Sequence, residues 1–262
     1  MQLLIKIIVV CGAIFASLGT AIAAEETANL GQDATRPRSR LDLRIKHQKF
    51  PNDLELTKLT TRVDHPIVLS NGWKLNTRIS QGFFSSDLPS TDNFDRETEL
   101  GFGDLLTQAF FIPPSRGNTS FGFGLRTIFP TATQDQFGTG KYGLVPIGVV
   151  LHFPSWLPPG SFVGLGVRNE IGFAGDDDRD DIHELQIVPL VNIRLLGKSF
   201  IGFFPTIRRD WKNNNDFFFP FDMEVGRAIG RGKVGSLRFQ IPMIDNRDRY
   251  DWSLEGRVTF LF

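Results

Sequence analysis

Hydrophobic and polar residues alternate along most of the chain. The stretch 251–262, "DWSLEGRVTFLF", has apolar residues or glycine at every second position and mostly polar residues between them. Alternation with a period of two is typical of a β-strand with one apolar and one polar face. The pattern recurs in segments bounded by turn residues, and it predicts twelve strands near 41–49, 55–68, 72–84, 99–112, 118–130, 142–153, 161–174, 184–195, 198–211, 217–229, 233–243 and 251–262.

The connections between these segments fall into two alternating classes. Short ones, such as "SNG" (70–72) and "LGK" (196–198), follow every second strand, and longer charged ones, such as "SSDLPSTDNFDRE" (85–97) and "GDDDRDDIH" (175–183), follow the others. Bacterial outer-membrane barrels have short periplasmic turns and longer outside loops. If the last strand ends in the periplasm, an upward strand must precede 55–68, and "LDLRIKHQK" (41–49) is the only candidate. Because that segment alternates poorly, ten strands is the alternative count.

The fold class that these patterns indicate is all-β, a transmembrane antiparallel up-and-down β-barrel of residues 41–262. The Trp and Tyr residues fall at strand ends, where the two membrane interfaces would lie. They are Trp73 and Trp156 at one end, and Trp211, Trp252, Tyr142 and Tyr250 at the other. A periplasmic β-sandwich also predicts alternating strands, but it predicts neither the two classes of connection nor the terminal Phe.

The first residues have the features of an export signal. A short segment with one cation, Lys6, precedes the apolar run 7–18, and "AIA" (21–23) offers a small-residue cleavage site. We therefore expect residues 1–23 to be a cleaved signal peptide, and the polar, aperiodic residues 24–40 to be a flexible leader. The one cysteine, Cys11, lies in the predicted signal, so no disulfide, cysteine zinc site or catalytic thiol is expected after it.

Composition and charge exclude several classes of function. Removing residues 1–23 takes Lys6 from the 29 basic residues and leaves 28 against 29 acidic ones, so nucleic acid is not an expected partner. The four histidines have no metal-ligand spacing, and no cofactor or metal is expected. His152 and Ser155 are close in sequence, but a barrel enzyme acting on lipid would place such a pair at the opposite end of the barrel. The expectation is that the protein is not an enzyme.

With the period fixed, the polar face of each strand should point into the lumen. Charges of both signs gather there, either as ion pairs that fill a closed interior or as the lining of a path for small solutes. The candidate lumen-lining residues are Arg78, Asp104, Arg126, Arg168, Glu170, Arg194, Arg208, Asp210, Asp222, Glu224 and Arg238.

Two resemblances follow from particular residues. The ending "GRVTFLF" resembles the C-terminal signal of bacterial outer-membrane proteins, which implies that Phe262, Phe260 and Val258 are read by the barrel-assembly machinery. Five segments resemble the outer-membrane transporters named for the "MetA-pathway of phenol degradation", over roughly residues 66–262. They are "GFGD" (101–104), "FPTATQDQFGTGKYGLVP" (129–146), "LQIVPLVNI" (185–193), "RRDW" (208–211) and the terminal "FLF".

The function expected from this reading is a channel or transporter of the bacterial outer membrane for small, aromatic or hydrophobic molecules. Its expected partners are the lipid bilayer, lipopolysaccharide, the barrel-assembly machinery and a small-molecule solute. A closed barrel with a structural or surface-interaction role is the alternative, followed by a barrel enzyme acting on lipid.

Overall fold

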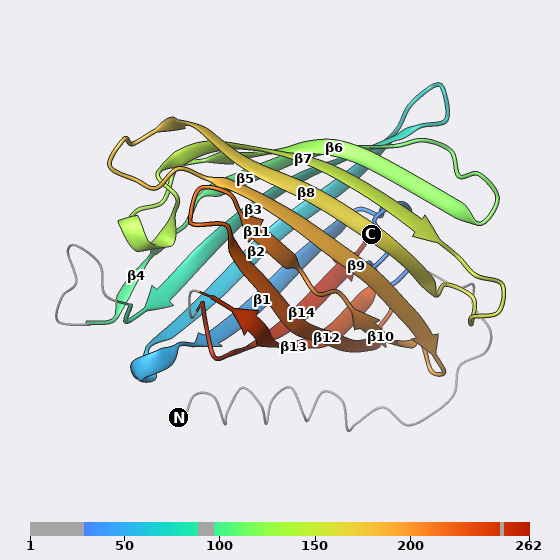
Figure 1. Ribbon diagram of the computed structural model, residues 1–262. Coiled ribbons are helices and arrows are strands. Elements are labelled where there is room, and N and C mark those ends of the chain that lie inside the picture. Colours follow the sequence, from blue (N-terminus) through green and yellow to red (C-terminus); the bar gives the residue numbers. More distant parts are fainter. Residues whose placement is uncertain (1–28, 89–96, 247–248) are drawn as a thin grey trace.

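The computed structural model describes residues 29–88, 97–246 and 249–262, which form one closed antiparallel barrel (Figure 1). The predicted signal peptide lies outside these residues. The elements are β1 (Arg40–Lys49), η1 (Pro51–Asp53), β2 (Glu55–Val68), β3 (Lys74–Ser86), β4 (Glu99–Phe102), β5 (Leu105–Ile112), β6 (Thr119–Phe129), η2 (Asp135–Phe137), β7 (Lys141–His152), β8 (Phe162–Gly175), β9 (His183–Leu195), β10 (Ser199–Phe203), β11 (Ile207–Asp210), β12 (Asp216–Gly230), β13 (Lys233–Asp245) and β14 (Trp252–Leu261).

Two of the barrel strands are interrupted. Segments β4 and β5 both pair with β3, and β10 and β11 both pair with β9 and β12. Pro205 lies in the second interruption, where a residue without an N–H cannot continue the ladder. The segments therefore build twelve barrel strands, which confirms the predicted count and shows that the ten-strand alternative is wrong.

The barrel closes between its first and last strands. β1 pairs antiparallel with β14 from Arg40 opposite Leu261 to Lys49 opposite Trp252, and it pairs with β2 on its other side. An even number of strands makes this last pairing antiparallel, so every described strand except the short β4, which pairs with β3 alone, has a neighbour on each side. The segment 41–49, whose alternation is irregular, is thus the strand that closes the barrel.

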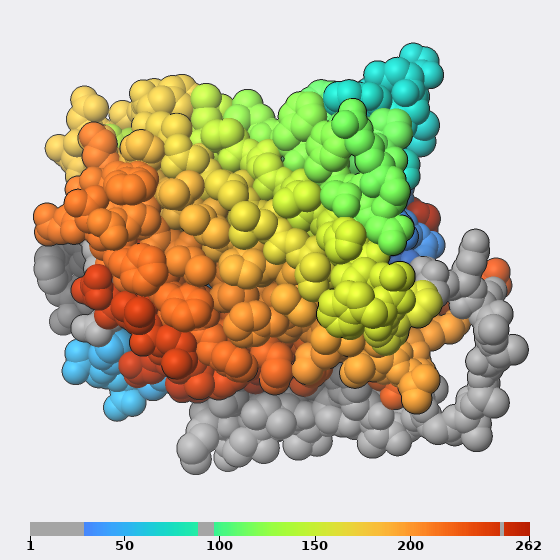
Figure 2. Space-filling model, turned by 45° about the vertical axis from the view of Figure 1, so that its right-hand side comes forward, coloured from blue at the N-terminus to red at the C-terminus, as the bar shows by residue number. Residues whose placement is uncertain are grey.

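The two faces of the wall have opposite polarity. In β2, Val63 is 45% exposed on the outside, whereas the next residue, Asp64, is 1% exposed on the inside. The outer surface is continuous over the yellow and orange strands in Figure 2. An apolar exterior and a charged, buried interior reverse the arrangement of a water-soluble barrel, and they match a wall that faces lipid.

The ends of the barrel also differ. We call the end with η1, β4 and η2 the loop end, and the opposite end, where β1 begins and Phe262 lies, the leader end (Figure 1). Connections at the leader end include 69–73 and 196–198, and those at the loop end include 130–140 and 176–182. These connections follow the alternation predicted from the sequence, whereas 50–54 at the loop end is short and 153–161 at the leader end is long. Among the described residues, no helix is long and apolar enough to cross a membrane.

Candidate functional site: the arginine-lined lumen

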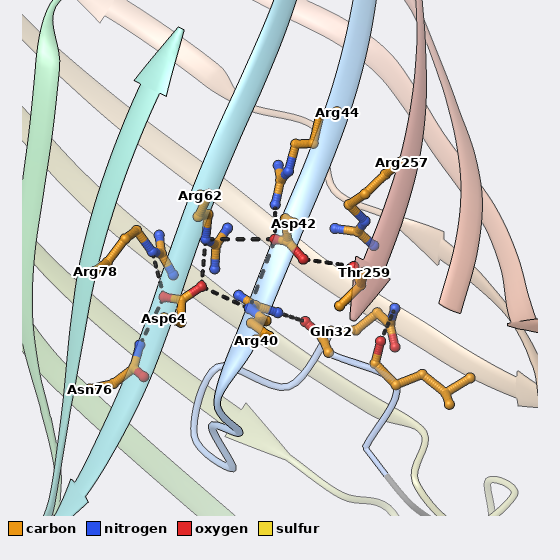
Figure 3. Close-up of polar contacts among 12 residues, drawn as sticks. Gln32, Arg40, Asp42, Arg44, Arg62, Asp64, Asn76, Arg78, Arg257 and Thr259 are labelled. Atoms are coloured by element: carbon orange, nitrogen blue, oxygen red, sulfur yellow. Dashed lines mark hydrogen bonds and ion pairs between the residues drawn. The ribbon is translucent and has the colours of Figure 1, made fainter. Parts of the chain in front are cut away.

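Asp64 organises a cluster of cations on the inner face of β1–β3 (Figure 3). Its carboxylate accepts hydrogen bonds from Arg40 Nε at 2.7 Å, Arg62 Nε at 2.6 Å and Arg78 Nε at 2.7 Å. Asn76 Nδ2 donates a fourth, at 3.1 Å. A buried carboxylate is stable only when its oxygens are satisfied, and here three guanidinium groups share one negative charge.

Asp42 is a second buried carboxylate beside this cluster. It accepts from Arg44 Nη2 at 2.8 Å and from Thr259 Oγ1 at 2.7 Å, and so ties β1 to β14. Arg40 and Arg62 also lie within 3.8 and 3.7 Å of it. The two aspartates thus share Arg40 and Arg62, and the cluster keeps an excess of positive charge.

A matching pair of contacts lies on β12–β14. Asp222 Oδ1 and Oδ2 accept from Arg238 Nε at 2.7 Å and Nη2 at 2.5 Å, a two-point contact of the kind that fixes a guanidinium in one plane. Gln240 Nε2 donates to the same carboxylate at 2.6 Å, and Arg257 donates to Glu224. These residues hold the adjoining part of the wall, because β14 pairs with β1.

A cavity of about 310 Å³ lies inside the barrel and is bordered by residues of both clusters. Nine arginines line it against three carboxylates, so its charge is strongly positive. One side is apolar, formed by β7 and β9. The charged lining is Arg38, Arg40, Arg44, Arg62, Arg78, Arg126, Arg168, Arg238, Arg257, Asp33, Asp64 and Glu224, and the apolar side includes Ile147, Val149, Leu151, Val188 and Leu190.

Among the cavity arginines that lie on strands, Arg126 and Arg168 have no carboxylate contact within the described part of the chain. Arg126 Nη2 donates to Gln108 Oε1 at 3.1 Å, and its Nε is buried without a hydrogen-bond partner. The side chain of Arg168 forms no hydrogen bond or ion pair with any described residue. Both guanidinium groups border the cavity, where they can meet an anion.

Residues 29–39 close the cavity at the leader end. Leu30 is 6% exposed and packs with Phe200, Val234 and Leu261 inside the barrel mouth. Arg40 Nη1 donates to the carbonyl of Gly31 at 2.6 Å, which joins the segment to the arginine cluster (Figure 3). This part of the leader, which the sequence predicted to be flexible, is held against the wall.

Further contacts fix the conformation of residues 29–39. Asn29 Oδ1 accepts from the amides of Gly31 and Asp33 at 2.9 and 3.2 Å, and Asp33 accepts from the Thr35 hydroxyl at 2.6 Å. The guanidinium of Arg36 lies 4.4 Å from the centre of the Phe153 ring, a cation–π contact. The segment therefore has a defined conformation that does not depend on secondary structure.

The loop end is narrowed by residues that precede β14. Arg249 donates to Asp216 at 2.8 Å and to Glu184 at 3.3 Å, and Tyr250 packs on Phe218 with ring centres 5.7 Å apart. Tyr250 is only 9% exposed, so its expected place in an interfacial aromatic belt is wrong. Burial raises the pKa of its phenol to about 12. The ring packs into the barrel because Phe218 points inward at that level.

Five of the eleven predicted lumen-lining residues border the cavity: Arg78, Arg126, Arg168, Glu224 and Arg238. Asp222 supports Arg238, Arg208 contacts Glu184 at 3.4 Å, and Glu170 follows Arg168 on the inner face of β8. Arg194 borders a smaller cavity beneath the leader segment.

Asp104 and Asp210, which the sequence also predicts to line the lumen, do not border the cavity. Asp104 accepts from the amide of Thr139 at 2.7 Å and its hydroxyl at 2.9 Å, and so fastens the connection 130–140. Asp210 accepts from Asn213 Nδ2 at 2.7 Å in the turn after β11. Both lie next to a loop whose backbone amides compete for the carboxylate.

Several residues of the site were missed in the sequence. Arg40, Asp42 and Arg44 alternate with Leu41 and Leu43, so the period of two was present, although "HQK" obscures it. The strand 55–68 also contains the polar series Thr60, Arg62 and Asp64. Arg249 and Tyr250 carried no such signal, because they follow a turn.

Other candidates have structural settings. Phe262 is exposed at the leader end, and its amide donates to Ser39 O at 3.0 Å. His152 Nδ1 lies 3.0 Å from Thr119 Oγ1, not from Ser155. No group of His, Cys, Asp and Glu suited to a metal ion occurs among the residues that the structure describes.

Comparison with known proteins finds similar structures but no matching family. The chain matches no protein-family model, and no curated protein sequence matches it. An outer membrane channel from Pseudomonas putida F1 has a similar structure, with a TM-score of 0.72 and 12% identity over 90% of this chain and 100% of that one. NanC porin superposes with a TM-score of 0.53 and 12% identity, over 85% of this chain and 98% of that one. KdgM porin in complex with disordered oligogalacturonate superposes with a TM-score of 0.52 and 9% identity, over 85% of this chain and 99% of that one.

The chain has the fold of an outer-membrane channel. At these identities the likeness extends to the fold alone, a twelve-stranded antiparallel closed barrel. The resemblance to the transporters of the "MetA-pathway of phenol degradation" has no matching family model behind it.

Proposed function

We propose that the protein is a passive channel of the bacterial outer membrane for small solutes. The observation that carries this is the reversed polarity of the wall, apolar outside and charged inside around a cavity. A membrane selects such a wall because lipid cannot hydrate charged side chains. Similarity of fold to a bacterial outer membrane channel supports the same reading.

The channel favours anions. Nine arginines against three carboxylates line the cavity, and field lines from a charged constriction exclude ions of the same sign. Carboxylates such as Asp64 and Glu224 moderate the effect. The apolar side of the cavity, with Val188 and Leu190, also suits solutes with an aromatic or other hydrophobic part.

Export and assembly complete the proposal. Residues 1–23 direct export and are removed, and the alternating ending with Phe262, Phe260 and Val258 is read by the barrel-assembly machinery. Connections at the loop end, such as 176–182, then face lipopolysaccharide, and those at the leader end face the periplasm.

Planar-bilayer recording tests the channel. The folded barrel should conduct, and in a KCl gradient its reversal potential should indicate a mild preference for chloride. Arg168→Gln should move that potential toward cation preference because it removes a cation from the cavity. Arg209→Gln is the matched control, since Arg209 alternates out of the lumen and lies 5.5 Å from the Trp211 ring. A folded wild type with neither conductance nor solute flux would leave a closed barrel with a structural role.

A further inference from the structure

Arg126 and Arg168 lie on the two strands that flank the apolar part of β7. Arg126 on β6 is opposite Val145 of β7, and Arg168 on β8 is opposite Ile147 of β7. The inward residues of β7 between and beyond them are Ile147, Val149 and Leu151, and all three border the cavity. Two guanidinium groups therefore flank a surface that has no polar side chain of its own.

Beside Arg168, the wall has an open position. Gly166 is the next inward residue of β8, and it also borders the cavity. A Cβ atom placed there would lie 3.6 Å from Val188 and 3.8 Å from Leu190, which is ordinary contact distance. A Cβ therefore fits at Gly166 beside aliphatic side chains, and the cavity lies beyond it. By contrast, the inward Gly164 is covered by Leu151, 2.7 Å from such a Cβ.

Among the cavity arginines on strands, these two are also the ones without a carboxylate contact in the described residues. Arg40, Arg62 and Arg78 each donate to Asp64, and Arg238 is held by Asp222. Within the described residues, the Arg126 side chain hydrogen-bonds only to the neutral Gln108, and the Arg168 side chain has no hydrogen bond. Glu170, on the same face of β8, forms no ion pair with either of them.

We propose that this part of the lumen is a binding site for a small monocarboxylate with an apolar body. The carboxylate meets Arg126 and Arg168, and the body lies over Gly166 against Val188 and Leu190. A guanidinium binds a carboxylate through paired N–H groups. A strongly hydrated inorganic anion would have to give up water molecules here, and the aliphatic side chains could not replace the lost hydrogen bonds. The inference rests on the proposed function, of which it names the solute class.

Calorimetric titration of the folded barrel in detergent tests the site with benzoate as the probe. Benzoate should bind saturably, and acetate, which lacks the body, and benzyl alcohol, which lacks the charge, should each bind at least about tenfold more weakly. Arg126→Gln and Arg168→Gln should each weaken benzoate binding by about tenfold or more, the usual effect of losing a hydrogen bond to a charged group.

The glycine supplies a matched pair of variants. Gly166→Leu should abolish benzoate binding by filling the space above β8. Gly148→Leu should leave binding unchanged, because Gly148 alternates to the outer face of β7 and a Cβ there meets no atom within 4 Å. Heat-modifiable mobility on gels confirms that each variant is folded before titration.

Each contrary result rejects the site. Equal affinity for acetate and benzoate would show only a general attraction of anions. Equal affinity for benzyl alcohol and benzoate would show an apolar pocket in which the arginines have no role. The same preparations are recorded in KCl. Conductance without benzoate binding overturns the site and leaves the channel, whereas binding without conductance overturns the channel and leaves the site.

Discussion

At the scale of single residues, the barrel depends on carboxylates that each serve several arginines. Asp64 is 1% exposed and accepts from three guanidinium groups, so it is the counter-charge that lets β1, β2 and β3 bring their cations together. Removing one partner of a buried ion pair leaves an uncompensated charge, and that costs more than the pair itself contributes.

Asp64→Asn should therefore destabilise the barrel by about 3 kcal/mol or more, because it leaves Arg40, Arg62 and Arg78 without their shared anion. Urea unfolding in lipid vesicles, followed by tryptophan fluorescence, measures the change. Asp178→Asn, in the exposed connection 176–182, is the control and should unfold like wild type. Equal urea midpoints for Asp64→Asn and Asp178→Asn would show that other contacts hold the arginines in place.

The terminal residue gives a second prediction at this scale. Deletion of Phe262, or Phe262→Asp, should leave export intact but lower the yield of heat-modifiable barrel in the outer membrane. The side chain is 73% exposed and alternates with the inward Leu261, so a lost packing contact does not account for the effect. Normal membrane yield of both variants would remove the assembly role.

At the scale of elements, the segment 29–39 decides whether the lumen is open at the leader end. It is anchored by Leu30 in the cluster with Phe200, Val234 and Leu261, and by polar contacts that include the hydrogen bond from Arg40 to Gly31. An apolar anchor of one side chain is worth about 2 kcal/mol of burial. A polar substitution there should release the segment while the barrel remains closed.

Leu30→Asp should accordingly raise single-channel conductance, since it places a charge in an apolar cluster and frees the segment from the mouth. Leu196→Asp introduces the same charge at the same end of the barrel on a side chain that is 97% exposed, and it should conduct like wild type. Deleting residues 29–38 should reproduce the effect of Leu30→Asp. Unchanged conductance in both leader variants would mean that solutes pass beside the segment.

The sequence predicts the strands well, but not every contact that their side chains make. A period of two is local, so it assigned strands and their inward faces, including that of Arg168. It could not tell Asp104, which binds the backbone at Thr139, from Arg126, which borders the cavity, since both have inward parity. The leader segment has no period at all, and its order comes from contacts with β10, β13 and β14, far away in the sequence.

At the scale of the whole molecule, the two kinds of connection predict which end faces the cell exterior. A cysteine at Asp178 should react with a membrane-impermeant thiol reagent on intact cells, whereas one at Gly197 should react only after the outer membrane is permeabilised. The sequence has a single native cysteine, Cys11, in the predicted signal peptide, so the background is low. The reverse pattern would invert the proposed orientation.

The hydrogen bond from Thr259 to Asp42 joins residues 217 positions apart, and the Leu30 cluster includes Leu261 from the same distant strand. Contacts over such separations form late, because the intervening chain must first be ordered. The apolar cluster that anchors the leader segment is therefore complete only once β14 has joined β1. It follows that a newly closed barrel passes through a stage in which its mouth at the leader end is unobstructed.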